Sequence, residues 1–203
     1  KTTDPIIIIT GGRGGAKSFT ISEFACRLTY KKKKKILYNR YTLTSAYLSI
    51  IPEYKEKIDL WDVSHHFTIT KEEIVNNLNG SLIIFKGIKT SSGNQTGNLK
   101  SIKDPTTWIL DEADEMPDYN TYQKIKRSFR KKGSKLRIIM AFNPPFKSHW
   151  MYETFFKPYN IPEYFNGSKN GITYIHTDYR DNIENLSEDF LNDVEKTKQN
   201  NFA

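Results

Sequence analysis

Residues 6–18 read Ile-Ile-Ile-Ile-Thr-Gly-Gly-Arg-Gly-Gly-Ala-Lys-Ser, and this stretch decides the fold class. The isoleucine run predicts a buried strand, and a helical pattern continues from Lys17 through Tyr30. A strand, a tight glycine-rich loop and a helix, in this order, open a nucleotide-binding βα unit. We therefore expect an α/β domain with a phosphate site at the loop.

The loop over residues 11–18 matches the Walker A pattern of P-loop NTPases, except that Ala16 replaces the usual glycine before the lysine. Its backbone N–H groups and the start of the helix are expected to surround the phosphates of ATP. Lys17 would reach the β- and γ-phosphates, and the Ser18 hydroxyl would ligate Mg²⁺. A glycine turn without a ligand is the alternative, but this loop follows a strand, opens a helix and ends in Lys-Ser. The predicted ATP-binding residues are Gly12, Arg13, Gly14, Gly15, Ala16, Lys17 and Ser18.

A second motif is the apolar strand predicted over residues 107–111, which ends in Asp111-Glu112. The carboxyl ends of parallel strands face the ligand crevice. We therefore expect Asp111 to hold Mg²⁺ through water and Glu112 to act as general base for the attacking water. The alternative is that both acids only favour the start of the next helix. The joint presence of both motifs argues against it.

Two further residues are candidates for the catalytic site. Asn143 follows a strand predicted over 136–142, where it would sense the γ-phosphate or the water; turn formation by Asn-Pro is the alternative. Arg13 would either stabilise charge on the γ-phosphate in cis or contact a neighbouring molecule.

Strands and helices alternate along the rest of the chain, which predicts a mainly parallel central sheet flanked by helices. Asn79-Gly80 between two β-like runs predicts an antiparallel hairpin insertion, and residues 90–97 predict a mobile loop. Further strands are expected over 36–39, 66–70 and 172–176. Further helices are expected over 43–58, where Pro52 should break or kink the helix, and over 119–131, 148–155 and from 187 onward.

Composition limits the classes of protein that this chain can belong to. It has 203 residues, a formal net charge of +8 and one cysteine, Cys26, so a disulfide framework is excluded. No apolar run is long enough to span a bilayer. The basic excess favours polyanionic partners. Lys31 to Lys35 form the densest basic patch, either as a solvated helix end or as a DNA contact.

The motifs together resemble one family, the large terminase of tailed phages. The resemblance rests on the arginine-containing loop over 11–18, the segments 98–102 and 108–115, and residues 179–182 with 186–188. Its most specific element is Phe-Asn-Pro-Pro at 142–145 with His149-Trp150.

This resemblance implies an ATP- and Mg²⁺-dependent motor that moves viral double-stranded DNA into a procapsid. It implies a P-loop NTPase of the RecA-like, ASCE type over residues 1–203, with a nuclease domain beyond residue 203. It also implies a homo-oligomeric ring in the host cytoplasm, transiently docked on the procapsid, with a portal protein and a small terminase subunit as partners. Lys100 is the candidate for a basic residue that acts in trans on a neighbouring subunit.

Two other functions remain as alternatives. Asp111-Glu112-Ala113-Asp114 spells the DEAD box of superfamily 2 helicases, but a Ser-Ala-Thr type motif would be expected where Asn143 and its prolines stand. A nucleotide-gated assembly scaffold without turnover is the non-enzymatic alternative. Intact Lys17, Ser18 and the two acids at 111–112 argue against it.

Overall fold

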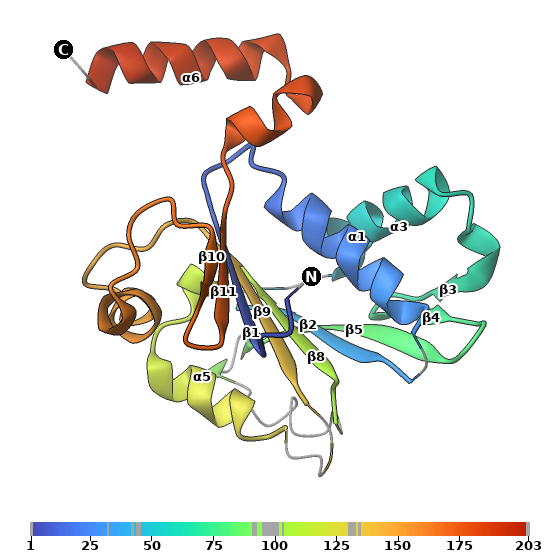
Figure 1. Ribbon diagram of the computed structural model, residues 1–203. Helices are drawn as coiled ribbons and strands as arrows, with labels where there is room; N and C mark the ends of the chain where they lie inside the picture. The colour runs from blue at the N-terminus through green and yellow to red at the C-terminus, as the bar shows by residue number, and fades with distance from the viewer. Residues whose placement is uncertain are drawn as a thin grey trace.

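A central β-sheet organises the computed structural model, which describes residues 2–31, 33–41, 43, 46–90, 93–94, 102, 104–129, 133 and 135–201. Within these residues the sheet has nine strands in the order β10-β11-β1-β9-β8-β2-β5-β4-β3 (Figure 1). The strands are β1 Ile6–Thr10, β2 Lys35–Arg40, β3 Phe67–Ile69, β4 Glu73–Asn76, β5 Ser81–Gly87, β8 Thr107–Asp111, β9 Arg137–Phe142, β10 Gly167–Lys169 and β11 Ile172–His176.

The six strands from β11 to β5 are all parallel to their neighbours. Antiparallel strands extend both edges, β10 beside β11 and β4 and β3 beyond β5. The predicted hairpin is confirmed: β4 and β5 are joined by a turn in which Gly80 has φ +72°. Because β5 also pairs in parallel with β2, this hairpin is continuous with the sheet.

Helices cover both faces of the sheet, as predicted (Figure 1). On one face, α1 and α3 pack over a core that contains Ile7, Ile9 and Tyr54. On the other face, α5 and the helical segment after β9 pack over Ile8, Trp108 and other buried side chains. The α-helices are α1 Lys17–Thr29, α2 Ala46–Ser49, α3 Ile51–Leu60, α5 Tyr119–Lys126 and α6 Glu188–Asn201; the shorter helical segments are η1 Ser64–His66, η2 Ala113–Glu115, η3 Tyr152–Phe156 (a π-helix), η4 Lys157–Tyr159 and η5 Tyr179–Asn185. None of the described helices is long and apolar enough to cross a membrane.

The helix expected over 43–58 is divided into α2 and α3, which confirms the break predicted from Pro52; this proline lies in the first turn of α3, where its missing N–H has no cost. One predicted helix end was wrong. The helix expected over 119–131 ends at Lys126, and nearby the Ser128 hydroxyl donates to the Ile125 carbonyl. In the predicted mobile loop, β6 Lys89–Thr90 pairs with β7 Gly93–Asn94, and the other residues lie outside the described ones.

Candidate active site

The glycine-rich loop connects β1 to α1 at the carboxyl edge of the sheet. Gly11 has φ +153°, and a Cβ there would lie 1.8 Å from the Thr177 carbonyl oxygen, so only glycine fits. Ala16, the last residue before α1, has φ +53° and ψ +25°. This left-handed conformation costs a residue with a Cβ about 1–2 kcal/mol. The departure from the Walker A pattern therefore falls at a position where glycine would be unstrained.

The segment after β11 supports this loop from a distant part of the chain. Thr177 donates from its backbone N–H to the Thr10 carbonyl at 2.9 Å and from its hydroxyl to the Gly15 carbonyl at 2.9 Å. The Asn182 amide donates to the Gly14 carbonyl at 3.0 Å. These hydrogen bonds attach the loop and the end of β1 to the segment after β11. Sequence reasoning gave Thr177 and Asn182 no such role.

Lys17 connects the loop to the end of β9. Its Nζ donates to the carbonyl oxygens of Gly11 at 2.5 Å and Gly12 at 2.9 Å, and to Asn143 Oδ1 at 3.3 Å. Burial lowers the pKa of Lys17, although Asp111 and the nearby Asp114 oppose this effect. Because β9 lies between β1 and β8, Asn143 ends up between the loop and the acids.

Asp111 is 3% exposed and is held by two side chains from β2. Tyr38 Oη donates to Asp111 Oδ2 at 2.5 Å, and Arg40 Nε and Nη2 donate to the same oxygen at 2.9 and 2.7 Å. Arg40 Nη1 also lies 3.5 Å from Glu112 Oε1. One guanidinium therefore joins both acids of the second motif.

Glu112 sits at the carboxyl end of β8 with φ +50° and ψ +46°, and its side chain is 48% exposed. Burial raises its pKa above the usual value, and the negative charge of Asp111 acts in the same direction, whereas Arg40 lowers it. The carboxyl group is thus half-exposed at the cavity and under the direct influence of Arg40.

Sequence reasoning missed Arg40, although a signal was present. Arg40 is the last residue of β2, one position beyond the predicted strand, and β2 is the direct neighbour of β8. The rule that ligands bind at the carboxyl ends of parallel strands applies to this residue as it does to Asp111. The available signal in the sequence was a charged residue at the carboxyl end of β2.

The glycine-rich loop and the carboxyl ends of β8 and β9 surround a cavity of about 440 Å³. It is lined by every predicted ATP-binding residue and also by Glu112, Asp111 and Asn143. Its oxygen donors include the Ser18 hydroxyl and the Asp111 carboxylate, which are ligands that suit Mg²⁺. The candidate Lys100 lies outside the described residues. The lining residues are Gly12, Arg13, Gly14, Gly15, Ala16, Lys17, Ser18, Phe19, Asp111, Glu112, Asp114, Ala141, Phe142, Asn143 and Asn182.

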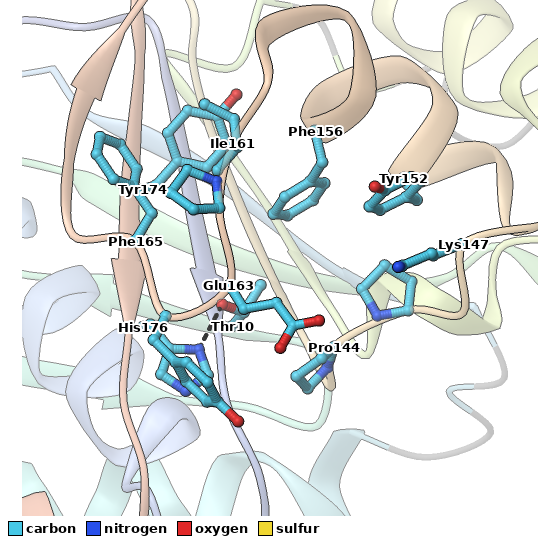
Figure 2. Close-up of a pocket in the computed structure, with 13 residues that line it drawn as sticks. Thr10, Pro144, Lys147, Tyr152, Phe156, Ile161, Glu163, Phe165, Tyr174 and His176 are labelled. Carbon is cyan, nitrogen blue, oxygen red and sulfur yellow. Dashed lines mark hydrogen bonds between the residues drawn. The ribbon is translucent and has the colours of Figure 1, made fainter.

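A second cavity of about 270 Å³ has a different chemical character (Figure 2). Pro144, the residue that follows Asn143 in the sequence, lines this cavity. The rings of Tyr152, Phe156 and Tyr174 also line it and make its walls mainly apolar. Thr10 Oγ1 and His176 Nδ1 lie 3.1 Å apart at its edge. Lys17 and the two acids at 111–112 do not line it, so the chemistry suited to phosphate belongs to the first cavity.

Trp150, from the most specific stretch of the resemblance, packs against the core that contains Ile8 and Trp108. Trp150 Nε1 donates to the Met116 carbonyl at 2.7 Å, and its ring packs against Tyr122 at 5.7 Å between centroids. Trp150 thereby attaches the segment after β9 to the segment after β8. It does not line either cavity.

Comparisons with known proteins converge on one family. The family model described as phage terminase large subunit matches residues 3–203. The terminase large subunit of Bacillus phage SPP1 is 25% identical over 209 residues, which cover 96% of this chain and 45% of that protein. The chain therefore spans less than half the length of this relative.

Solved structures show the same fold at low sequence identity. The large terminase of a thermophilic bacteriophage has a TM-score of 0.69 and 14% identity, over 92% of this chain and 43% of that one. The same thermophilic phage protein has been solved with ADP and with ATP-γ-S. The N-terminal domain of the DNA packaging ATPase from bacteriophage phi29 has a TM-score of 0.63 and 16% identity, over 90% of this chain and 93% of that one.

Proposed function

The chain belongs to the phage terminase large-subunit family, and on this premise we propose that it is an ATP-hydrolysing motor domain that drives viral double-stranded DNA into a procapsid. The observation that carries the proposal is the single cavity lined by Lys17, Asn143, Asp111 and Glu112. We further propose that it works in the host cytoplasm as a ring, with a portal protein and a small terminase subunit as partners.

Phosphate binding is the first task of this cavity. Backbone N–H groups over 12–18 would surround the phosphate oxygens, at the N-terminus of α1. Lys17, which now donates to the Gly11 and Gly12 carbonyls, would turn toward the β- and γ-phosphates. Ser18 and Asp111 would hold Mg²⁺, which supplies positive charge to the phosphate oxygens when bound.

Proton transfer from water is the second task, and we assign it to Glu112. Its raised pKa makes the carboxylate a better proton acceptor than an ordinary glutamate. Asn143 is already hydrogen-bonded to Lys17 at 3.3 Å, so a movement of Lys17 toward phosphate would free Asn143 Oδ1. Asn143 is therefore well placed to report the presence of the γ-phosphate to the segment after β9.

The test is ATP turnover with Mg²⁺, measured for the wild type and for Glu112→Gln. The substitution keeps the size of the side chain but removes the charge, so turnover should fall by roughly 10²–10⁴-fold while nucleotide binding persists. Glu153→Gln is a matched control, because Glu153 is also 48% exposed and also pairs with one cation, Lys157. Near-normal turnover in Glu112→Gln would reject its role. A wild type that binds ATP without turnover, with and without DNA, would favour the scaffold.

A further inference from the structure

The amino edge of the sheet, opposite the candidate active site, gathers basic residues from separate parts of the chain. β2 begins at Lys35 and β9 begins at Arg137, and β8 lies between these two strands. The segment before β8 joins them directly: Thr106 N donates to the Lys35 carbonyl at 2.8 Å, and Arg137 N donates to the Thr106 carbonyl at 3.1 Å. Figure 1 shows these strand ends on the side of the sheet away from α6.

We call this surface the basic edge and define it by seven residues. Those residues are Lys31, Lys33, Lys34, Lys35, Lys135, Arg137 and Lys169. Lys31, Lys33, Lys135 and Lys169 are exposed and form no ion pair within the described part of the chain. Among the described residues, these four positive charges therefore face solvent without an ion-pair partner.

Few acids offset this charge. Asp4 lies near the start of β1, where Ser168 and Thr173 donate to it at 2.5 and 2.7 Å, and Asp104 precedes β8. Asp59 and Asp62 lie further along, near η1, which leads into β3. Between β10 and β2 the described edge therefore carries seven basic residues against two acidic ones.

The dimensions of the edge suit a duplex. Neighbouring strands lie about 4.8 Å apart, so the five steps from β10 to β2 cover roughly 24 Å. A DNA duplex carries one negative charge per about 1.7 Å of its axis, or about 14 phosphates over that length. Exposed lysines without partners are the groups that neutralise phosphates and release counterions. They carry no information about base sequence.

We propose that the basic edge binds the phosphate backbone of double-stranded DNA, without regard to base sequence. DNA and nucleotide would then contact opposite edges of one sheet. The proposal rests on the proposed function only in the choice of DNA as the polyanion, because the edge itself is defined by charge and geometry.

The experiment is fluorescence anisotropy with a labelled duplex of roughly 25 base pairs, without nucleotide, between about 50 and 200 mM salt. The test variant combines Lys33→Glu with Lys135→Glu. Its matched control combines Lys55→Glu with Lys71→Glu, which makes the same charge change at exposed positions on α3 and between β3 and β4. The test variant should bind about 10-fold or more weakly, and its salt slope should fall by about 2.

Several results would overturn the proposal. These are unchanged binding in the test variant, an equal loss in the control pair, or a strong preference of the wild type for one of two unrelated duplexes. If the double glutamate variant fails to show wild-type circular dichroism, Lys33→Gln with Lys135→Gln takes its place. This glutamine variant should also bind DNA more weakly than the wild type, although by a smaller factor. If it bound DNA as tightly as the wild type does, the proposal would be overturned equally.

Two readouts separate this proposal from the proposed function. The test variant should keep wild-type ATP turnover in the absence of DNA, because neither substituted lysine lines the active-site cavity. Lys17→Ala should keep DNA binding while it loses turnover. If Lys17→Ala still hydrolyses ATP and the test variant loses DNA binding, only the proposed function fails. If the test variant binds DNA normally and Lys17→Ala loses turnover, only the basic edge fails.

Discussion

The two edges of the sheet differ in how their charges are arranged. At the carboxyl edge, Arg40 pairs with both Asp111 and Glu112, and Lys17 donates to loop carbonyls and to Asn143. At the amino edge, Lys31, Lys33, Lys135 and Lys169 are exposed and form no ion pairs among the described residues. Paired and buried charges hold particular atoms in place, as chemistry on a phosphate requires. Exposed charges of the same sign fix no particular atom and supply only an electrostatic potential, which is sufficient to attract a polyanion.

The difference also shows why the two edges of a parallel sheet suit different functions. All its parallel strands end at one edge, so residues of different chemical types converge there from distant parts of the sequence. The carboxyl edge can be tested for its completeness within one chain, for the coupling between its charges and for strain in its loop.

The largest expected effect concerns whether one chain completes the carboxyl edge. A basic group supplied by a neighbour is worth roughly 10³–10⁵ in kcat. If Lys100 acts in trans, turnover per chain should rise steeply with protein concentration. If Arg13, which is exposed and lines the cavity, acts in cis, turnover should not depend on concentration and Arg13→Ala should abolish most of it.

Mixed assemblies distinguish the two cases. Glu112→Gln chains keep Lys100, and Lys100→Ala chains keep Glu112, so mixing two inactive variants should restore turnover under the trans hypothesis. Turnover that neither rises with concentration nor recovers on mixing would leave Arg13 as the better candidate.

The next effect is on nucleotide binding. Lys17→Ala removes the ammonium group that lies inside the loop, and loss of one partner of a charged contact costs about 2–5 kcal/mol, or roughly 30- to 4,000-fold in affinity. Calorimetric titration with an ATP analogue measures this loss. Lys124→Ala, at an exposed lysine on α5, should bind as the wild type does. Equal affinities for both variants would refute the assignment of the phosphate site.

A smaller effect is expected at Arg40. Arg40→Ala leaves Asp111 with the Tyr38 hydroxyl alone, and loss of such a supporting partner costs roughly 10–100-fold in activity. The pH profile tests the electrostatic part. Because Arg40 lowers the pKa of Glu112, its removal should raise that pKa, and the acid limb of kcat should move to higher pH. Arg40→Lys should reverse part of this shift, whereas an unmoved acid limb would show that Arg40 acts only through packing.

The smallest effect is on stability. Ala16→Gly relieves the left-handed backbone at the end of the loop, and the free energy of unfolding should increase by up to about 1 kcal/mol after the entropic cost of glycine. Ala25→Gly, in the middle of α1, should instead lower it by about 1 kcal/mol or more. Urea unfolding measures both. A loss of stability in Ala16→Gly would mean that this conformation is not strained.

Local sequence patterns were sufficient for the elements that carry the site. The glycine loop between strand and helix, the two acids at the carboxyl end of β8 and the asparagine that follows β9 all lie where periodicity and turn chemistry predicted. Short-range steric preferences and hydrophobic repeats determine such features, so a few neighbouring residues suffice to predict them. Helix ends were predicted less well: the helix expected to reach residue 131 ends at Lys126, and the Ser128 hydroxyl just beyond it donates to the Ile125 carbonyl. Such side-chain bonds compete with the continuation of a helix.

Only the tertiary structure decided which of these elements are neighbours. Arg40 meets Asp111 across 71 positions of sequence, and Asn182 meets Gly14 across 168. The basic edge likewise exists only because β2 and β9 flank β8. Strand order and register depend on how the whole core packs, and no local pattern along the chain encodes them. Sequence alone therefore determined the chemical groups available to this protein, and the packing of its sheet decided which of those groups act together.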